Sequence, residues 1–406
     1  MNTKRFLFSA CAFILLGCQE HVPQSGMWTG ALDVGENKHI PFRLFLDLNS
    51  ATPAGYFLNG PEQTSIPEIL VHGDSLSLLF SEYGAAMRGI WDGKEWRGRF
   101  FRYRTDTSSN YFAVAPEHVI KDRPVSGSSA GLPLLGDYQA NISSVLGIDS
   151  TTRAKFWMKG DSIFGTLIAP DGDYGLLAGI QIGSKATLTR FTGWQAFLLE
   201  LERQDTHWTG RLYTRSGKPM ELTLIPQPVL ATEQHSSMST TIKNWKKPFT
   251  FFGTTSTGKV LSSEDPSLKN KALLIDIMGT WCHNCMDAAP LLQQISSEFG
   301  KDGLVVIGLA FEISDNPEVA KKNLGLFQKR YGLTYPMLFC GSTNDENVGQ
   351  KLRSQLNNFS GYPTTLFLNK KGIVKSIHVG FHGPGTGEEY QRQVQQYYKT
   401  VRELIH

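Results

Sequence analysis

The sequence predicts a multidomain protein in which an all-β N-terminal region precedes an α/β C-terminal domain. Two observations support this fold class. Short runs of alternating apolar and polar residues, separated by glycine and polar turns, fill residues 26 to 228. From residue 249 onward, apolar strands alternate instead with segments whose apolar residues recur every three or four positions, as in amphipathic helices. A length of 406 residues is enough for two or three such domains.

The first residues have the features of a secretion signal. Lys4 and Arg5 provide positive charge, and the apolar segment over residues 6–16 is too short to span a bilayer as a mature helix. The segment ends in a Leu-Leu-Gly-Cys tetrapeptide that closes with Cys18. This tetrapeptide resembles a bacterial lipobox, which implies cleavage of residues 1–17 and attachment of lipid to Cys18. A plain secretory signal is the alternative.

A lipid on Cys18 would anchor the protein in a bacterial cell envelope, with residues 18–25 as a tether. Gln19, rather than an aspartate, follows the cysteine, which favours the periplasmic face of the outer membrane. Removal of the signal takes two basic residues away, so the net charge becomes 38 minus 37, or +1. This small charge gives no basic field, and no nucleic-acid partner is expected.

The β-rich region contains an internal repeat, with one module over residues 26–122 and another over residues 134–228. Trp28 in Gly-Met-Trp corresponds to Tyr138 in Gly-Asp-Tyr, 110 positions later, and Trp96 corresponds to Trp208 after a two-residue slip. We expect tandem antiparallel modules, either two small sandwiches or two halves of one barrel. Most tryptophans of this region are expected in the β cores.

A polar linker over residues 229–248 leads to the C-terminal domain at residues 249–406. The elements predicted there are a hairpin over 249–261, a buried strand over 273–278, a helix over 285–299, a strand over 303–310, a helix over 317–331, a strand over 335–339, a helix over 346–359, two strands over 363–368 and 373–379, and a terminal helix over 388–405.

Two closely spaced thiols follow the buried strand. Cys282 and Cys285 lie two residues apart where the strand gives way to a helix. Backbone N–H groups and the helix dipole favour an anion there, so the pKa of the first thiol should fall. The second thiol lies one helical turn further on, within reach of a mixed disulfide formed by the first. This arrangement indicates dithiol–disulfide exchange.

Two further residues fit that chemistry. Asp276 interrupts an otherwise apolar strand, where a carboxylate is costly unless it has a role. Pro363 precedes a second apolar strand, where it is a candidate for a cis peptide bond at a functional site.

Together, the Trp-Cys-x-x-Cys motif, the buried aspartate and the proline before a strand resemble the thioredoxin superfamily, in particular its TlpA/ResA-like branch of envelope thiol–disulfide oxidoreductases. The resemblance covers residues 249–405 and implies a thioredoxin-like fold. It implies that Cys282 is the nucleophile and Cys285 the resolving thiol. It also implies that Asp276 accepts the proton of Cys285 and that cis-Pro363 docks the substrate backbone.

The neighbours of these residues are expected to contact substrate or to adjust the thiols. Trp281, Tyr362 and Thr364 are the predicted substrate contacts. His283, if protonated, would stabilise the Cys282 thiolate, and its alternative is a solvated loop residue. Asn284 stands where many family members have proline, which bears on the redox poise of the pair.

A second departure from the family concerns the helix after the thiols. Ala288 stands where the branch often carries glutamate, with Asp287 one position early. The remaining cysteine of the C-terminal domain, Cys340, is expected to be a buried small apolar residue.

These features favour a membrane-anchored oxidoreductase that reduces disulfides of envelope proteins and is recharged by a membrane electron donor. No cofactor beyond the Cys282–Cys285 disulfide and no metal are expected. The alternatives are a disulfide oxidase or isomerase, a copper- or zinc-handling protein in which His283 or His378 joins the thiols, and a β-rich binding module with an accessory redox domain.

Overall fold

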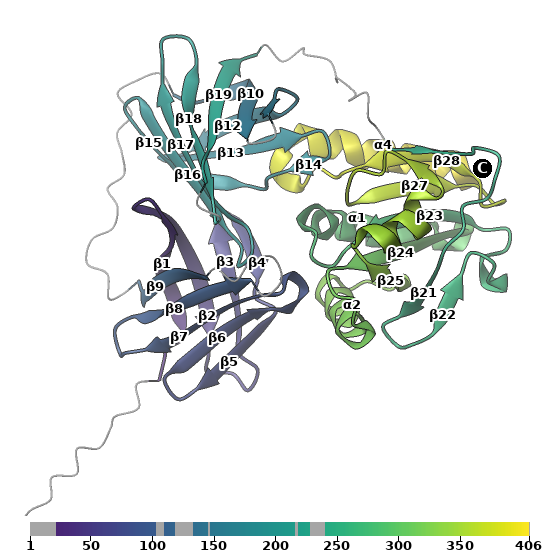
Figure 1. Ribbon diagram of the computed structural model, residues 1–406, viewed down its shortest axis with the longest axis horizontal. Helices are drawn as coiled ribbons and strands as arrows, with labels where there is room; N and C mark the ends of the chain where they lie inside the picture. Colours follow the sequence, from purple (N-terminus) through teal and green to yellow (C-terminus); the bar gives the residue numbers. More distant parts are fainter. Residues whose placement is uncertain are drawn as a thin grey trace, which may run out of the picture.

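The computed structural model describes residues 22–102, 109–117, 133–144, 147–215, 218–227 and 240–405. Two antiparallel β sheets are followed by an α/β domain (Figure 1), which confirms the predicted fold class. The predicted signal peptide, Cys18 and the first residues of the tether lie outside the described residues. Within the described ranges, no helix is both long and apolar enough to cross a membrane.

The first sheet contains nine antiparallel strands in the order β4-β3-β2-β1-β9-β8-β7-β6-β5. The sheet curls so that Ile69 in the edge strand β5 packs against Gly55 in β3, the strand next to the other edge. We call this sheet the first barrel. Its strands are β1 (Gly26–Gly35), β2 (Lys38–Asp47), β3 (Ala54–Asn59), β4 (Glu62–Ser65), β5 (Glu68–His72), β6 (Ser75–Phe80), β7 (Ala85–Trp91), β8 (Trp96–Arg102) and β9 (Ser109–Pro116).

The second sheet closes on itself, because β10 pairs with both β12 and β19. We call it the second barrel. Neither predicted arrangement was right, since each module forms one curled sheet of its own. The strands of the second barrel are β10 (Gly136–Ser144), β11 (Gly147–Asp149), β12 (Arg153–Lys159), β13 (Ser162–Ala169), β14 (Gly172–Asp173), β15 (Leu177–Ile182), β16 (Lys185–Phe191), β17 (Ala196–Arg203), β18 (Trp208–Thr214) and β19 (Met220–Pro226).

Alternation of apolar and polar residues explains both barrels. Along β6, every second residue is buried, as a period of two requires for a strand with one face toward a core. Trp28, Trp96 and Trp208 point into the cores as expected. Trp194 instead stacks on Tyr83 at 4.7 Å between ring centroids and joins the two barrels.

The C-terminal domain is built on a seven-stranded mixed sheet in the order β22-β21-β25-β24-β23-β27-β28. The central strand β23 is parallel to β24 and antiparallel to β27. The strands are β21 (Phe252–Thr255), β22 (Val260–Ser262), β23 (Ala272–Met278), β24 (Leu304–Glu312), β25 (Met337–Ser342), β27 (Thr364–Leu368) and β28 (Val374–Val379); the helices are α1 (His283–Phe299), α2 (Pro317–Tyr331), α3 (Asp345–Val348) and α4 (Glu388–Ile405).

The predicted helix over residues 346–359 was wrong in most of its length. Only α3 and one wide helical turn over Gly349–Arg353 form, and the chain then enters the short strand β26 (Leu356–Asn357). Asn358 follows with a positive φ of 50°, a backbone conformation that ends helices. β26 pairs with β20 (Thr241–Ile242), so the predicted linker over 229–248 is already part of the C-terminal domain at its end.

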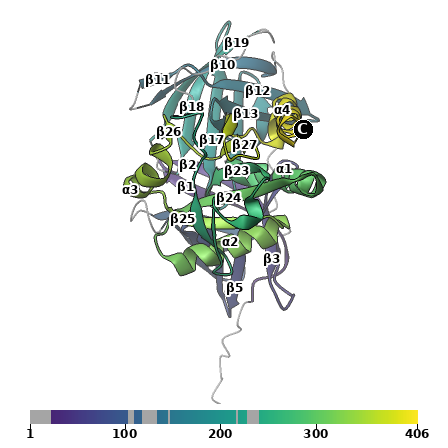
Figure 2. The same cartoon turned by 90° about the vertical axis from the view of Figure 1, so that its right-hand side faces the viewer.

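The barrels pack directly on the C-terminal domain (Figures 1 and 2). One apolar cluster runs without interruption from Phe57 and Phe80 of the first barrel to Met286 in α1 and Phe327 in α2. A buried ion pair crosses the same boundary, since Glu82 of the first barrel lies 3.0 Å from Arg330 of α2. The three bodies therefore share a core around the start of α1.

Candidate active site

The two thiols lie at the N-terminus of α1. The buried strand β23 ends at Met278, and Cys282 serves as the N-cap residue of the helix. The Cys285 N–H donates a hydrogen bond to the Cys282 sulfur at 3.3 Å, and the two sulfurs are joined in a disulfide. When the pair is reduced, this N–H and the helix dipole favour a thiolate on Cys282.

The cis peptide bond expected at Pro363 is present between Tyr362 and Pro363. It brings the Tyr362 carbonyl oxygen to 3.5 Å from the Cys282 sulfur. A backbone carbonyl next to the reactive sulfur provides an acceptor for the main chain of a substrate segment.

The side chains predicted to contact substrate have different positions. Trp281 donates its indole N–H to the Phe311 carbonyl at 2.9 Å and meets the Tyr362 ring edge-on at 5.4 Å. Thr364 is fully buried, and its hydroxyl donates to the Gly361 carbonyl at 2.8 Å. The Thr364 side chain thereby links the start of β27 to the proline loop.

Asp276 lies on the same face of the sheet as the thiols. Leu274 and Met278, which flank it at a spacing of two residues, share one apolar cluster with Cys282 and Cys285. Burial raises the pKa of Asp276 to about 7, although a hydrogen bond from the Thr365 hydroxyl at 3.4 Å acts to lower this pKa. A carboxyl group with such a pKa exchanges protons near neutral pH.

Glu312 is a site residue that the sequence interpretation missed. It accepts hydrogen bonds from the Thr280 N–H at 2.9 Å and the Thr280 hydroxyl at 2.7 Å, and it is almost fully buried. These bonds fix the loop that carries Trp281 and Cys282. The sequence did contain a signal for Glu312, because this carboxylate ends an apolar strand segment. Asp276 is a comparable carboxylate within another apolar strand.

His283 does not act as predicted. Burial and the positive charge of Arg190 lower the pKa of His283 to about 3, so the imidazole is neutral near pH 7. A protonated His283 therefore does not stabilise the Cys282 thiolate, and the alternative of a solvated loop residue fails as well. A carboxyl oxygen of Asp287 lies 3.2 Å from the Nε2 atom of His283. Burial raises the pKa of Asp287 well above its usual range.

Asn284 and Cys340 have structural surroundings that the sequence did not reveal. Asn284 packs so closely on Gly172 of the second barrel that a Cβ at Gly172 would overlap its amide. Cys340 is buried in the cluster on the opposite face of the sheet, and burial raises the pKa of its thiol to about 12. Cys340 is thus a small core residue, as expected.

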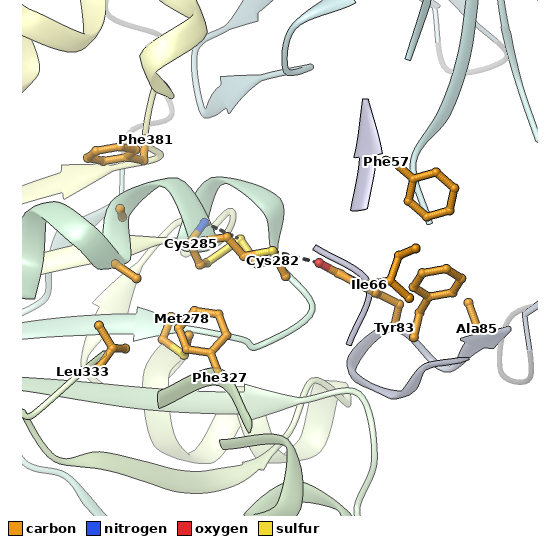
Figure 3. Packing of buried hydrophobic residues seen from close by; sticks show 14 of the residues in the cluster. Phe57, Ile66, Tyr83, Ala85, Met278, Cys282, Cys285, Phe327, Leu333 and Phe381 are labelled. Carbon is orange, nitrogen blue, oxygen red and sulfur yellow. Dashed lines mark hydrogen bonds between the residues drawn. A yellow bond between two sulfur atoms is a disulfide. The ribbon is translucent and has the colours of Figure 1, made fainter. Parts of the chain in front are cut away.

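The first barrel also reaches the active-site helix. The Tyr83 hydroxyl lies 2.8 Å from the Met286 sulfur, one residue after Cys285 (Figure 3). In Figure 3 the ring of Tyr83 lies between the first barrel and the start of α1. Cys282, at the start of the same helix, retains only 6 % of its accessible surface.

Residues 243–394, which contain the thiols, Asp276 and Pro363, match the family model described as Redoxin. They form a redoxin domain. The thioredoxin-like protein YneN of Bacillus subtilis is 33% identical to this chain over 127 residues, which cover 30% of this chain and 66% of YneN. The chain thus spans slightly less than two thirds of YneN.

Two further relatives are named for thiol chemistry. The thiol-disulfide oxidoreductase ResA of Bacillus thuringiensis is 26% identical over 145 residues, covering 36% of this chain and 70% of ResA. The thiol:disulfide interchange protein DsbE of Pseudomonas fluorescens is 29% identical over 136 residues, covering 33% of this chain and 66% of DsbE. The redoxin domain is therefore related to thiol–disulfide oxidoreductases and carries its CxxC pair at the start of α1.

Proposed function

We propose that this protein is a lipid-anchored thiol–disulfide oxidoreductase that reduces disulfides of cell-envelope proteins through Cys282 and Cys285. The observation that carries the proposal is the position of Cys282, which caps α1 and lies 3.5 Å from the carbonyl of the cis-proline loop. One sulfur is thereby placed for attack, next to a backbone group that can align a substrate segment. The chemistry requires no cofactor other than the cysteine pair.

The reaction proceeds in two exchanges. The Cys282 thiolate attacks one sulfur of the substrate disulfide, a mixed disulfide forms, and the other substrate sulfur leaves as a thiolate. Cys285 then loses its proton to Asp276 and attacks the Cys282 sulfur, which releases the second substrate thiol. Two electrons pass to the substrate, and the dithiol becomes the Cys282–Cys285 disulfide. Trp281 and Tyr362 line the approach and contact the substrate.

The direction of electron flow is supported by the state of His283. A protonated histidine next to Cys282 would stabilise the thiolate and make the pair more oxidising. The low pKa of His283 removes that contribution. Asn284 stands in place of the usual proline and remains as a feature that makes the pair more oxidising. An oxidase or isomerase is therefore the second candidate.

The cellular setting follows from the N-terminal residues. A lipid on Cys18 would place the redoxin domain on the periplasmic face of the outer membrane, with a membrane electron donor to regenerate the dithiol. Envelope proteins with thiols or disulfides are the proposed partners, and nucleic acid is not.

Trapping experiments test the function. In cells, Cys285→Ser should accumulate mixed disulfides between Cys282 and a few envelope proteins, because the resolving thiol is absent. Cys340→Ser is the matched control, since Cys340 is buried on the other face of the sheet. Alkylation of wild-type protein in intact cells should find the pair mainly as the dithiol. A pair found almost wholly oxidised would instead favour the oxidase or isomerase.

A further inference from the structure

A turn of the second barrel reaches into the active site. Strand β13 and the short strand β14 form a hairpin through Pro170 and Asp171, and the hairpin extends toward the redoxin domain (Figure 1). Asp171 is exposed at its tip, whereas Gly172 and Asp173 are buried. Nothing in the exchange chemistry of the redoxin domain requires this hairpin.

The hairpin lies against three segments of the redoxin domain: the start of α1, the proline loop and the loop after β28. At the start of α1, Gly172 packs on the amide of Asn284. At the proline loop, an Asp171 carboxylate oxygen lies 3.9 Å from the position that a Cβ on Gly361 would take. At the loop after β28, a Cβ on Gly380 would overlap the Asp171 backbone. The hairpin therefore occupies the space in which these segments converge.

Hydrogen bonds hold the hairpin in this position. The Gly383 N–H donates to the Asp173 carboxylate at 2.6 Å, and the same carboxylate accepts from the Gly175 N–H. The His382 ring lies 3.2 Å from the Ala169 carbonyl oxygen. Asp173 thus connects the second barrel to the loop after β28 through two backbone donors.

The interface between the barrels and the redoxin domain holds these parts in one fixed arrangement. Domains move relative to one another unless their interface is large and apolar, and here one apolar core runs from the first barrel into α1 and α2. Arg190 of the second barrel forms two 2.8 Å contacts with Glu62 of the first barrel and lies 3.4 Å from His283. These buried contacts hold the hairpin in place, so it is a fixed element and not a hinged flap.

A cavity lies beside the proline loop. Its volume is about 350 Å³, and Trp281, Phe359, Gly361 and Tyr362 line it together with Arg353. Trp281 adjoins Cys282 in the chain, and the Tyr362 carbonyl lies beside the Cys282 sulfur. This volume suits one or two side chains of an extended segment and is far smaller than a folded domain.

We propose that the β13–β14 turn is a specificity element that forms a fixed wall beside Cys282. The wall admits disulfides carried by extended, flexible polypeptide segments along the Trp281–Tyr362 side and excludes disulfides held in compact folded proteins. This inference rests on the proposed exchange function, because it concerns which disulfides reach Cys282. The chemical step is unchanged, and selection acts by steric exclusion of the wrong partner.

The test compares one disulfide in two settings. The reduced full-length mature chain reacts with a linear peptide that contains a two-cysteine disulfide, or with a small folded protein that contains the same disulfide segment. We expect the peptide to react about tenfold faster or more. Asp173→Ala loosens the wall and should raise the rate with the folded protein several-fold, while Asp161→Ala, at an exposed turn at the opposite end of β13, should not.

A second variant covers the case in which Asp173→Ala fails to fold. Asp171→Trp adds bulk at an exposed position beside Gly361 and should slow the peptide reaction more than the reaction with hydroxyethyl disulfide. Equal rates for peptide and folded protein in the wild type, or the same peptide-to-protein ratio in all variants, would overturn the inference.

Access is also measured without turnover. Alkylation of Cys282 in Cys285→Ser protein should be fast with a maleimide attached to a linear peptide and much slower with a maleimide attached to a small folded protein, and Asp173→Ala should reduce the difference. This readout separates the two proposals. If no disulfide reacts, the proposed exchange function is wrong. If both reagents alkylate Cys282 equally fast, the proposed specificity role of the β13–β14 turn is wrong.

Discussion

Arg190 of the second barrel lies 3.4 Å from the imidazole of His283, the residue directly after Cys282. The guanidinium is fully buried, and its charge is balanced by the Glu62 carboxylate through two contacts of 2.8 Å. A positive charge at this position disfavours protonation of the histidine, in addition to the cost of burial. A β module that seemed an accessory in the sequence thus sets the charge state next to the thiols.

The neutral state of His283 predicts how the thiol titrates. Since the pKa of His283 is about 3, its charge does not change between pH 5 and pH 9. His283→Gln should therefore shift the pH midpoint of Cys282 alkylation by less than about 0.5 unit. Alkylation rates measured across pH 5–9 in a Cys285→Ser background provide the check. A larger drop in reactivity at low pH in the variant would mean that a histidinium supports the thiolate.

Asp276→Asn should slow resolution of a mixed disulfide more than its formation, because only resolution needs a proton acceptor for Cys285. In the wild type the resolution rate should rise as pH passes through about 7, where the Asp276 carboxyl loses its proton. Rapid-quench measurement of the two steps separates them. Equal rates for variant and wild type at pH 7 would make Asp276 a tolerated polar core residue.

The same group predicts a stability difference. The folded pKa of Asp276 is raised, so the protonated form is favoured on folding, and stability falls as pH rises from the unfolded value near 4 to the folded value near 7. Asp276→Asn removes this loss, which amounts to at most about 4 kcal/mol at pH 8. Urea unfolding at pH 5 and pH 8 should show the variant gaining stability relative to wild type at the higher pH.

The Glu82–Arg330 contact predicts that the first barrel and the redoxin domain unfold together. Burial raises the pKa of Glu82 to about 7, and Arg330 is its charged partner at 3.0 Å. Arg330→Met leaves a buried carboxyl group without that partner and should cost about 3 kcal/mol or more, with a larger loss at pH 8 than at pH 5. Urea unfolding monitors the change.

Lys329→Met is the matched control, because Lys329 is the exposed neighbour on the same helix. Glu82→Gln should restore part of the stability in the double variant, since it removes the charge that Arg330 balances. An Arg330→Met protein as stable as Lys329→Met would show that the contact contributes nothing.

The lipobox-like tetrapeptide that ends at Cys18 predicts a lipid anchor. Cys18→Ser should move the protein from the membrane fraction to the soluble fraction, because several acyl chains are lost with the thiol. Fractionation, with near-UV circular dichroism to check the fold, provides the measurement. A Cys18→Ser protein that stays in the membrane fraction with its fold intact would count against lipid anchoring.

Local signals in the sequence predicted much of the redoxin domain. The helix α2 was predicted with its observed bounds, because Asn316 caps its start, Pro317 occupies its first position and Gly332 ends it with a positive φ. Cys282, Cys285 and cis-Pro363 were identified because their chemistry depends on short spacings and on one dipeptide. The helix expected over 346–359 failed because a strand pairing with Thr241–Ile242 overrides its local pattern.

The sequence determined the buried strand before the thiols, the thiol pair, the cis-proline loop and the alternating patterns typical of β strands. Each of these features depends on residues close together in the chain. Only the tertiary structure decided that each module forms its own barrel, that Gly172 lies against Asn284, and that burial and the charge of Arg190 keep His283 neutral. Those outcomes depend on pairs far apart in the chain, which leave no periodic signal in it. Burial and charge at such contacts are set by what packs around a residue, so the environment of the thiols became visible only once the barrels were in place.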